Sequence, residues 1–598
     1  MERNSQSSIP CDSGAKTEIA IPFLRFPNEI RNYIYKNYLL LDEGYDLNPH
    51  TNKLRSGKGR PIQLDLMYTC KRVAVEMRGL PLRLNTINFS AFHPLSKIDR
   101  AIVGRFGHAI ALLDEELDTS FYEATPNLFH DKVVREISDA YPAFAPVLDA
   151  MKTGQKNVFR HFCSPFGQAP SACREFIHWT LDRILFYKSL YQDDFDAFVN
   201  VLEIPDECPP IDEIIRSYNP ASWRIPTQDH LESLYRIFGG RREVAVRCPM
   251  GDVFKDEKLP SDLRRFRYSA AAAAIRFLDS IPQTSRSCLR DIRLLEDRPS
   301  VSNPECHGLG LIRFCQENPL MRIERRVSLW KTVFAGDPFR QTAWQARQPL
   351  TRILADQISE RIGVWTVEAL ALAAAGMPQE SFTLVFDGDS DGDWKCEQIF
   401  QHVVLRDAAW QQAMDECFKR GILPHQSWLE RRLNPRHAGN WSVIPGHPNR
   451  NRPVNWCYLF DGFPQAMRDI VKGNSIVCCS FNPGKLWDIE RLIEDQRSWS
   501  LTEWKFRWSR KQKYYLHNHL VNPRLSMRGV SWRRWKSKVE RQRRRRAAKW
   551  PDDVQNDYLE RYLERLLAQS EQRERDNEFR RIEGEAEEDW GLPNDEDM

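Results

Sequence analysis

The pattern of apolar and polar positions begins with a helical segment near the N-terminus. Over residues 21–41 apolar side chains recur at helical spacing, and Pro27 suits a first helical turn because its missing N–H is not needed there. A second helical pattern covers residues 66–77, and Ile87 and Phe89 then alternate with polar residues as in a short strand. This stretch is therefore predicted to hold two helices followed by a strand.

From residue 96 to about residue 260 the pattern is mainly helical. Clusters of Pro and Gly divide it into separate helices, because both residue types interrupt helical periodicity. We expect the apolar residues of these helices to form a core and not a ligand pocket. The predicted helices cover residues 97–114, 131–152, 171–202 and 228–238.

The pattern changes near Tyr268, after which helices alternate with strands. An Ala-rich helix at residues 269–280 is stopped by Pro282. Such alternation predicts a partly parallel sheet covered by helices. Strands are predicted at 289–297, 381–389 and 475–482, and helices at 361–375 and 464–472. The clearest strand places Met321, Ile323, Val327 and Leu329 on one side and Arg322, Glu324, Arg326 and Ser328 on the other.

Three of these strands share an apolar-x-apolar-x-x-Asp/Asn pattern that echoes a leucine-rich repeat. Their starts lie 92 and 93 residues apart, whereas the repeat itself is about 20–29 residues long, so a regular solenoid is not expected. Two interpretations remain open: an ordinary α/β domain, or a degenerate leucine-rich-repeat-like array. The pattern is formed by Ile292, Leu294 and Asp297, by Leu384, Phe386 and Asp389, and by Val477, Cys479 and Asn482.

Composition places the chain among folded, globular proteins. It has 598 residues, of which 41% are hydrophobic and 28% charged, and this length suggests several structural units. The purely apolar runs are far shorter than the roughly 18 residues of a membrane span, and the polar start lacks the apolar segment of a secretory signal. We therefore expect no membrane span, a location in the nucleus and/or cytoplasm, and mostly free thiols among the 14 cysteines.

Charge is concentrated in the C-terminal hundred residues. Residues 501–550 carry 17 Lys/Arg and two Glu, a net of +15, and residues 551–598 carry six Arg and 17 Asp/Glu, a net of −11. Tryptophans interleave with the basic run, a mixture that single-stranded nucleic-acid binders use. Trp499, Trp504 and Trp508 are expected to pack on the folded body, and the roles of Trp532, Trp535 and Trp550 are left open. A nuclear-import or nucleic-acid-binding patch is predicted at Arg533, Arg534, Lys536, Lys538, Arg543, Arg544, Arg545 and Arg546.

Each catalytic or ligand-binding motif that starts in the sequence lacks an essential residue. Residues 308–313 start like a dinucleotide-binding fingerprint but lack its third glycine, and the acidic loop 387–392 lacks the closing carboxylate of a calcium site. Cys306, His307 and Cys315 fit no standard zinc spacing. No catalytic residue, metal or cofactor is therefore predicted, and we expect the protein not to be an enzyme.

The N-terminal motif has a family resemblance. FLRFPNEIRNYIYKNYLL, followed by LDLMYTCKRVAVEM and NTINF, resembles the F-box-like segment of a large, mostly uncharacterised group of filamentous-fungal proteins. Residues 269–326 also look like sequences of that group. The resemblance implies docking on the small adaptor subunit of cullin-RING ubiquitin ligases through Phe26, Pro27, Ile30 and Ile34. In this chain Phe26 replaces the usual leucine and residues 42–61 form an insertion, and the alternative is a helix pair packed only on its own protein.

Together these features predict an α-rich fold of mixed α+β or α/β class and a non-enzymatic adaptor or substrate-recognition function. The alternative is a nuclear, nucleic-acid-associated protein that acts through its basic segment. The expected organisation is a disordered N-terminus (1–20), an F-box-like domain (21–95), a mainly helical region (96–260), an α/β region (261–500), a basic Trp/Arg-rich segment (501–550), an amphipathic charged helix (551–583) and an acidic disordered tail (584–598).

Overall fold

The computed structural model describes residues 23–57, 61–94, 97–154, 167–202, 210–217, 221–237, 267–334, 352–389, 393–432, 458–511 and 515–517. Contacts group the chain into two units, 1–522 and 523–598, and every described residue belongs to the first. The segment predicted at 501–550 is therefore divided between the two units. The predictions for residues 1–20, 551–583 and 584–598 lie outside the described residues.

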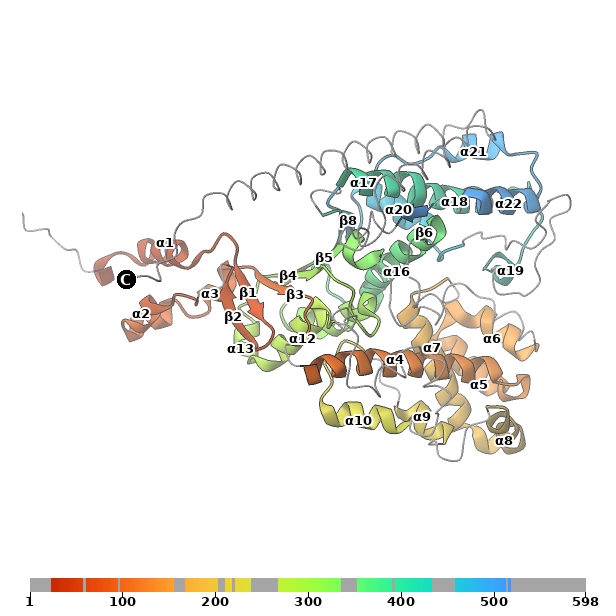
Figure 1. Ribbon diagram of the computed structural model, residues 1–598, viewed down its shortest axis with the longest axis horizontal. Coiled ribbons are helices and arrows are strands. Elements are labelled where there is room, and N and C mark those ends of the chain that lie inside the picture. Colours follow the sequence, from red (N-terminus) through yellow and green to blue (C-terminus); the bar gives the residue numbers. More distant parts are fainter. Residues whose placement is uncertain are drawn as a thin grey trace, which may run out of the picture. The chain divides into compact units, whose positions relative to one another are not determined.

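A seven-stranded sheet runs through the first unit in the order β2-β1-β3-β4-β5-β7-β8 (Figure 1). Six strands pair in parallel in the same order as they occur along the chain, and β2 pairs antiparallel with β1. This confirms a mixed α/β fold with a partly parallel sheet. The strands are β1 (Tyr45–Asn48), β2 (Lys53–Ser56), β3 (Ile87–Ser90), β4 (Asp291–Glu296), β5 (Arg322–Ser328), β7 (Phe382–Asp387) and β8 (Val477–Cys479).

The N-terminal segment is built into this sheet. The insertion between its two predicted helices forms the β1–β2 hairpin, and β3 pairs with β4 so that Ile87 lies opposite Ile292. Residues 21–95 and 261–500, which the sequence treats as separate regions, therefore share one sheet. The N-terminal helices are η1 (Phe23–Arg25), α1 (Asn28–Leu39), η2 (Asp65–Tyr68), α2 (Lys71–Glu76) and α3 (Leu80–Leu84).

Helices fill the described part of the chain between β3 and β4. The single helices predicted at 131–152 and 171–202 are wrong, because each is broken. Pro142 forces Tyr141 out of the helical region, and Tyr191 is also non-helical, with its hydroxyl donating to the carbonyl of Ile184. The elements are α4 (Lys97–Glu123), η3 (Pro126–Leu128), α5 (Asp131–Ala140), η4 (Pro142–Phe144), α6 (Ala145–Lys152), α7 (Pro170–Phe186), η6 (Lys188–Leu190), α8 (Gln192–Val201), α9 (Ile211–Ser217) and α10 (Gln228–Ile237).

The remaining helices alternate with the strands, as predicted. Ser269 begins α12 as its N-cap, with its hydroxyl accepting from the N–H of Ala272. Two short π-helices, η10 (Leu329–Val333) and η11 (Phe400–Val404), follow β5 and α17, and β6 (Arg352–Leu354) pairs with β9 (Tyr515–His517) in a small antiparallel sheet. The other helices are α12 (Ala270–Ser280), α13 (Gln283–Arg286), η9 (Pro304–Leu311), α14 (Ile312–Glu317), α16 (Ala355–Ala374), α17 (Asp393–Ile399), α18 (Leu405–Lys419), α19 (Trp428–Arg432), α20 (Phe463–Lys472), α21 (Ile489–Asp495) and α22 (Leu501–Lys511).

Buried and accessible side chains alternate along the central strands β4 and β5. In β5, Ile323 and Val327 are buried while Arg322, Glu324 and Arg326 are partly exposed, as predicted. Ser328, predicted on the polar side, is buried because its hydroxyl donates to Asp389.

Arg325 shares the inward side of Ile323 and Val327, although the apolar pattern had assigned it to neither side. It stands in a row of cross-strand partners between Leu294 of β4 and Leu384 of β7, so a charged group occupies the middle of an apolar layer.

A buried ion pair accommodates this charge. Arg325 Nη2 lies 2.8 Å from Glu296 Oε1, and both side chains are almost completely buried. Arg325 also donates to the carbonyl of Pro304 and lies over the ring of Trp365 at 4.8 Å. Glu296 in turn accepts hydrogen bonds from the first N–H groups of α12, those of Ala270 and Ala271. The pair thus connects β4, β5, α12, η9 and α16.

Replacing Glu296 with Gln should destabilise the folded unit by about 3–5 kcal/mol, because it leaves the Arg325 charge buried without its counter-ion. The matched control is Glu324→Gln, which breaks the exposed pair with Arg293 and should change stability by less than about 1 kcal/mol. Urea unfolding followed by tryptophan fluorescence measures both variants. Equal effects of the two substitutions would contradict the special role of the buried pair.

Candidate functional site

Helix α1 has an unusual division between its two sides. The inward side carries Arg31, Tyr35 and Leu39, which recur at four-residue spacing and are all buried. Tyr35 and Leu39 pack with Val73 and Met77 in one core cluster. We call the group of η1, α1, η2, α2 and α3 the N-terminal module. The polar Arg31 therefore faces the interior of this module, and the apolar stripe noted in the sequence faces outward.

The inward side is held by a charged hydrogen-bond network around Glu76 of α2. Arg31 donates to both carboxylate oxygens, at 2.7 and 2.9 Å, and the Tyr35 hydroxyl donates at 2.7 Å. Arg31 also donates to the carbonyl of Phe26, which ties the start of α1 to the same network. The hydrogen bond from Arg31 is the main cause that holds the pKa of Glu76 at about 2. This network fixes which side of α1 points outward.

The predicted partner-binding residues lie on or beside the outward side of α1. Pro27 is the exposed N-cap, Ile30 is 46% exposed, and Phe26 and Ile34 are half-buried. We call Pro27, Ile30, Tyr33, Ile34 and Tyr38 the outer face of α1. Tyr33 and Tyr38, which are 69% and 37% exposed, were not among the predicted contacts, although their helical spacing from Ile30 places them on the same side.

A Ser–His pair has the contacts of a catalytic dyad but not its accessibility. Ser269 Oγ lies 2.7 Å from His307 Nδ1, and His307 Nε2 lies 2.7 Å from the carbonyl oxygen of Ser302. Both side chains are buried, and burial is the main cause that lowers the pKa of His307 to about 3. Since Ser269 already caps α12, this pair stabilises a helix start and offers no nucleophile to a substrate.

The other candidate metal and acidic residues also have structural partners. Cys306 and Cys315 are buried, and burial raises the pKa of each thiol to about 12. In the acidic loop, Asp387 accepts from Arg326, while Asp389 accepts from Ser328 and Lys331. Across the described residues, no group of three or more His, Cys, Asp or Glu is placed to hold a metal ion.

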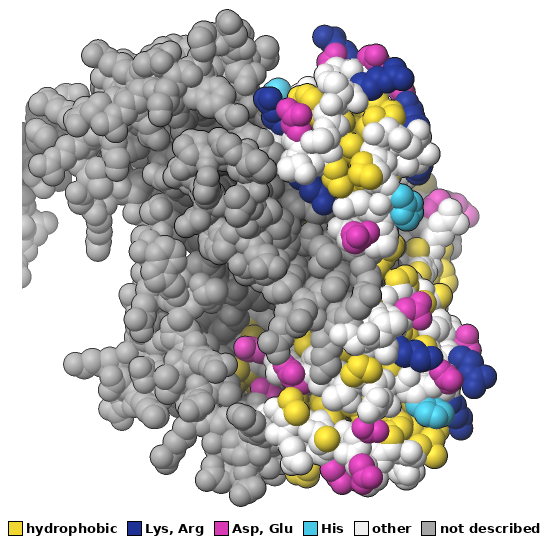
Figure 2. All heavy atoms as spheres, turned by 90° about the vertical axis from the view of Figure 1, so that its right-hand side faces the viewer, with side chains coloured by type: hydrophobic (Ala, Val, Ile, Leu, Met, Phe, Trp, Pro, Cys, Tyr) yellow, Lys and Arg dark blue, Asp and Glu magenta, His cyan; other side chains and the backbone are white. Residues whose placement is uncertain are grey.

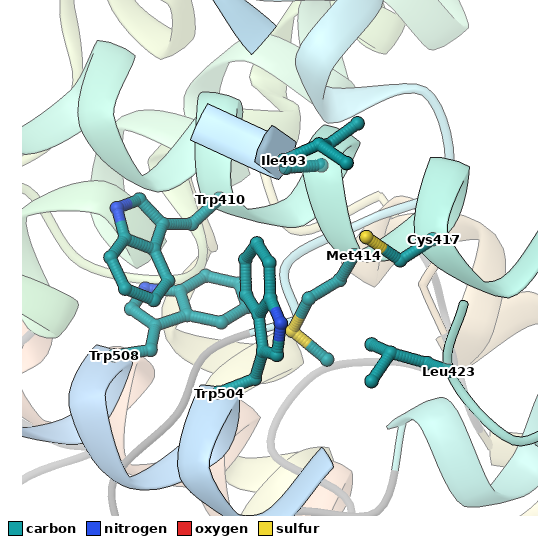
Figure 3. Packing of buried hydrophobic residues seen from close by; sticks show 8 residues of the cluster. Trp410, Met414, Cys417, Leu423, Ile493, Trp504 and Trp508 are labelled. Carbon is teal, nitrogen blue, oxygen red and sulfur yellow. The ribbon is translucent and has the colours of Figure 1, made fainter. Parts of the chain in front are cut away.

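The first tryptophans of the basic segment belong to the core. Trp504 and Trp508 are fully buried on α22, and Figure 3 shows them pointing toward Trp410 of α18. Trp508 Nε1 donates to the buried carboxylate of Asp407 at 3.1 Å. Trp499 packs against the same cluster. The predicted packing of these three tryptophans is confirmed, and the fully buried Trp504 and Trp508 are not available for stacking on bases.

No basic patch stands out on the described surface in view. On the face shown in Figure 2, the described Lys and Arg side chains are interspersed with Asp and Glu. The predicted nucleic-acid and import residues from Arg533 to Arg546, together with Trp532, Trp535 and Trp550, lie outside the described residues.

Comparison with protein-family models, curated proteins and solved structures gave no significant match to this chain. The F-box-like resemblance therefore stays a prediction. Within the part of the chain that is described, none of the helices is long and apolar enough to cross a membrane.

The Arg31–Glu76 network should make the N-terminal module sensitive to acid. Because the pKa of Glu76 is lowered from 4.5 to about 2, its stabilising effect is complete above pH 4.5 and is lost as the pH falls toward 2. Glu76→Gln should speed hydrogen exchange in α1 and α2 at pH 6 and remove the extra pH dependence in that window. Hydrogen-exchange mass spectrometry, corrected for intrinsic rates, measures this, with Glu29→Gln on the exposed side of α1 as the control. Identical pH profiles for Glu76→Gln and the wild type would argue against the network.

Proposed function

We propose that this protein is a non-enzymatic adaptor. Its N-terminal helices dock on the small adaptor subunit of a cullin-RING ubiquitin ligase, and its α/β and helical parts recognise a second protein. It acts in the nucleus and/or the cytoplasm. The observation that carries the proposal is the outer face of α1, where Ile30, Tyr33 and Tyr38 are exposed while the opposite side is anchored through Arg31.

An apolar helix side of this kind suits recognition in a groove of a partner. Helix-in-groove complexes use anchors at the i, i+3, i+4 and i+7 spacing, and Ile30, Tyr33 and Ile34 provide the first three. Tyrosine is enriched at the centres of protein interfaces because its ring buries apolar area and its hydroxyl keeps a polar contact. Docking there would leave the core cluster of Tyr35, Leu39, Val73 and Met77 undisturbed.

We also propose that the protein is not an enzyme, because its candidate catalytic groups have structural partners. The Ser269–His307 pair, which has the contacts of a nucleophile and its base, is buried and occupied in helix capping. The carboxylates of Asp387 and Asp389 are likewise engaged by neighbouring side chains. These groups are therefore assigned to the folding of the sheet and its loops.

The double variant Ile30→Asp and Ile34→Asp should reduce co-purification of the ligase adaptor subunit by at least tenfold, which corresponds to about 1.4 kcal/mol. Charges on the outer face of α1 oppose burial in an apolar groove, whereas neither isoleucine belongs to the core cluster of the module. The measurement is affinity purification of the tagged full-length protein from its native cell, with quantitative mass spectrometry.

The matched control is Tyr68→Asp with Val75→Asp, two positions that are 81% and 71% exposed elsewhere on the same module. This control should retain the adaptor, because the charges are placed away from α1. If the wild-type protein does not retain the adaptor subunit, the ubiquitin-ligase part of the proposal fails.

A second candidate function is nucleic-acid binding through the basic segment. Residues 523–550, which begin the second unit, carry 12 Lys/Arg and one Glu. Such a density of cations binds polyanions by releasing condensed counter-ions, with little sequence preference. Since Trp504 and Trp508 are core residues, any stacking on bases falls to the tryptophans after residue 522.

Neutralising Arg543, Arg544, Arg545 and Arg546 to Gln in the full chain should weaken binding of single-stranded RNA and lower the slope of log K against log salt by up to about 3, near 0.7 for each lost contact. Removing residues 584–598 should strengthen binding, because the acidic tail competes for the same cations. Fluorescence anisotropy over a salt series measures both effects. Neutralising Arg293, Arg313, Arg322 and Lys419 on the described surface is the control. A wild-type protein without salt-dependent binding at low ionic strength would eliminate this candidate.

A further inference from the structure

Helix α2 has an exposed side that the ligase proposal does not use. Val73 and Met77 belong to the core cluster of the N-terminal module, and the Glu76 carboxylate accepts from Arg31. These contacts fix the rotation of α2 about its axis. The remaining side, which starts at Tyr68 of η2, is therefore held toward solvent in one orientation.

This side of α2 places an apolar residue among cations. Val75 is 71% exposed, and its helical neighbours at the i−4, i−3 and i+3 positions are Lys71, Arg72 and Arg78. The helical turn continues to Arg78, whose N–H donates to the carbonyl of Val75. Lys71 and Arg78 are exposed, and the side chain of Arg72 is 56% exposed. We call Tyr68, Lys71, Arg72, Val75 and Arg78 the basic side of α2.

Two of the three cations lack a counter-ion. Neither Lys71 nor Arg78 forms an ion pair with any residue that the structure describes. Arg72 Nε lies 3.0 Å from Glu76 Oε1, but the same carboxylate also binds Arg31, so two guanidinium groups share one negative charge. The basic side of α2 therefore has positive charge that the described part of the chain does not neutralise.

The acidic residues of this segment do not change that sign. Residues 65–78 contain only Asp65 and Glu76 as acids, against three Lys/Arg, and Arg31 contributes a fourth cation from α1. Two positive charges thus remain after every acid is counted. A surface with this excess attracts an anionic partner, and the attraction weakens as salt rises.

The central position of Val75 decides which kind of anionic partner fits. Single-stranded nucleic acids stack their bases on aromatic rings, whereas the residue surrounded by cations here is a valine. Attachment to a membrane surface takes a broad apolar face, and the basic side of α2 offers only Tyr68 and Val75. Protein interfaces combine an apolar centre with a polar rim, which is the arrangement around Val75.

We propose that the basic side of α2 binds an acidic segment of a partner protein. A large apolar side chain of that segment packs on Val75, and flanking carboxylates pair with the surrounding cations. Lys71 and Arg78 give up no ion pair with a described residue when they bind it. Rim charges of this kind supply orientation and fast association more than raw affinity, so binding is sensitive to salt. The proposal concerns α2 and not the outer face of α1, and it holds or fails independently of the ligase proposal.

Photo-cross-linking of a helical peptide to the full-length protein tests this proposal. The peptide, of about 15 residues on an Ala/Gln background, has a central benzoylphenylalanine and glutamates three and four residues to either side, so that all five share one side of the helix. A control peptide of equal composition has its glutamates two and five residues away, on the opposite side. Mass spectrometry should map attachment to residues 65–78, at least fivefold stronger for the first peptide. Mapping also separates this site from the basic segment 501–550, which attracts any acidic peptide.

The two unpaired cations provide the most direct variant. Lys71→Gln with Arg78→Gln removes no ion pair between described residues and should lower attachment to residues 65–78 at least fivefold. The matched control is Lys53→Gln with Arg55→Gln, which removes the same charge from two exposed residues of β2. This control should leave attachment unchanged, because neither residue lies on α2.

Two double variants separate this surface from the outer face of α1. Tyr68→Asp with Val75→Asp should lose the cross-link and keep the ligase adaptor, whereas Ile30→Asp with Ile34→Asp should do the reverse. Equal attachment of the two peptides to residues 65–78, or unchanged attachment after neutralisation of the two cations, would show the proposal to be wrong. It is also wrong if polyuridylate or phosphatidylserine vesicles, at equal negative charge, suppress this attachment as well as unlabelled peptide does, because the surface then recognises charge alone.

Discussion

The buried pair of Arg325 and Glu296 is the constraint on which the rest of the sheet depends. An arginine in the middle of an apolar layer is tolerated because Glu296, the Pro304 carbonyl and the Trp365 ring surround it. Since side chains alternate along a strand, holding Arg325 inward also holds Arg322, Glu324 and Arg326 outward. A slip of one residue in β5 would bring those three charges into the core, so the pair fixes register as well as packing.

The N-terminal module also contains a buried arginine paired with a glutamate, here on a helix. Arg31 is directed inward by Glu76, and the helix is thereby rotated so that Ile30 and Tyr33 face solvent. An ordinary amphipathic helix would place its most apolar side toward its own core. Here the carboxylate of α2 determines the orientation, and apolar residues remain exposed on the outer side. In β5 and in α1, a buried arginine determines which side chains of the element face solvent.

Much of the secondary structure follows from local pattern, and the exceptions have identifiable causes. The Ala-rich helix α12 and strand β5 are found where the sequence predicts them because caps, stop signals and alternation agree. Arg325 and Arg31 could not be assigned from pattern, because a buried charge depends on a partner distant in sequence. The β1–β2 hairpin was missed because its pairing with β3 gives no local signal. Of the candidate site, the apolar positions of α1 were predictable, but their outward orientation was not.

The adjacency of β3 and β4 also has a consequence for biosynthesis. These strands are direct neighbours in the sheet, yet about 200 residues separate Ser90 from Asp291. At a synthesis rate of about 5–20 residues per second, β3 leaves the ribosome roughly 10–40 seconds before its partner strand exists. During that interval the backbone groups of β3 that later pair with β4 have no strand beside them, and an unpaired edge can recruit other chains. The long helical insertion therefore leaves this edge of the nascent sheet without its partner until residue 296 has emerged.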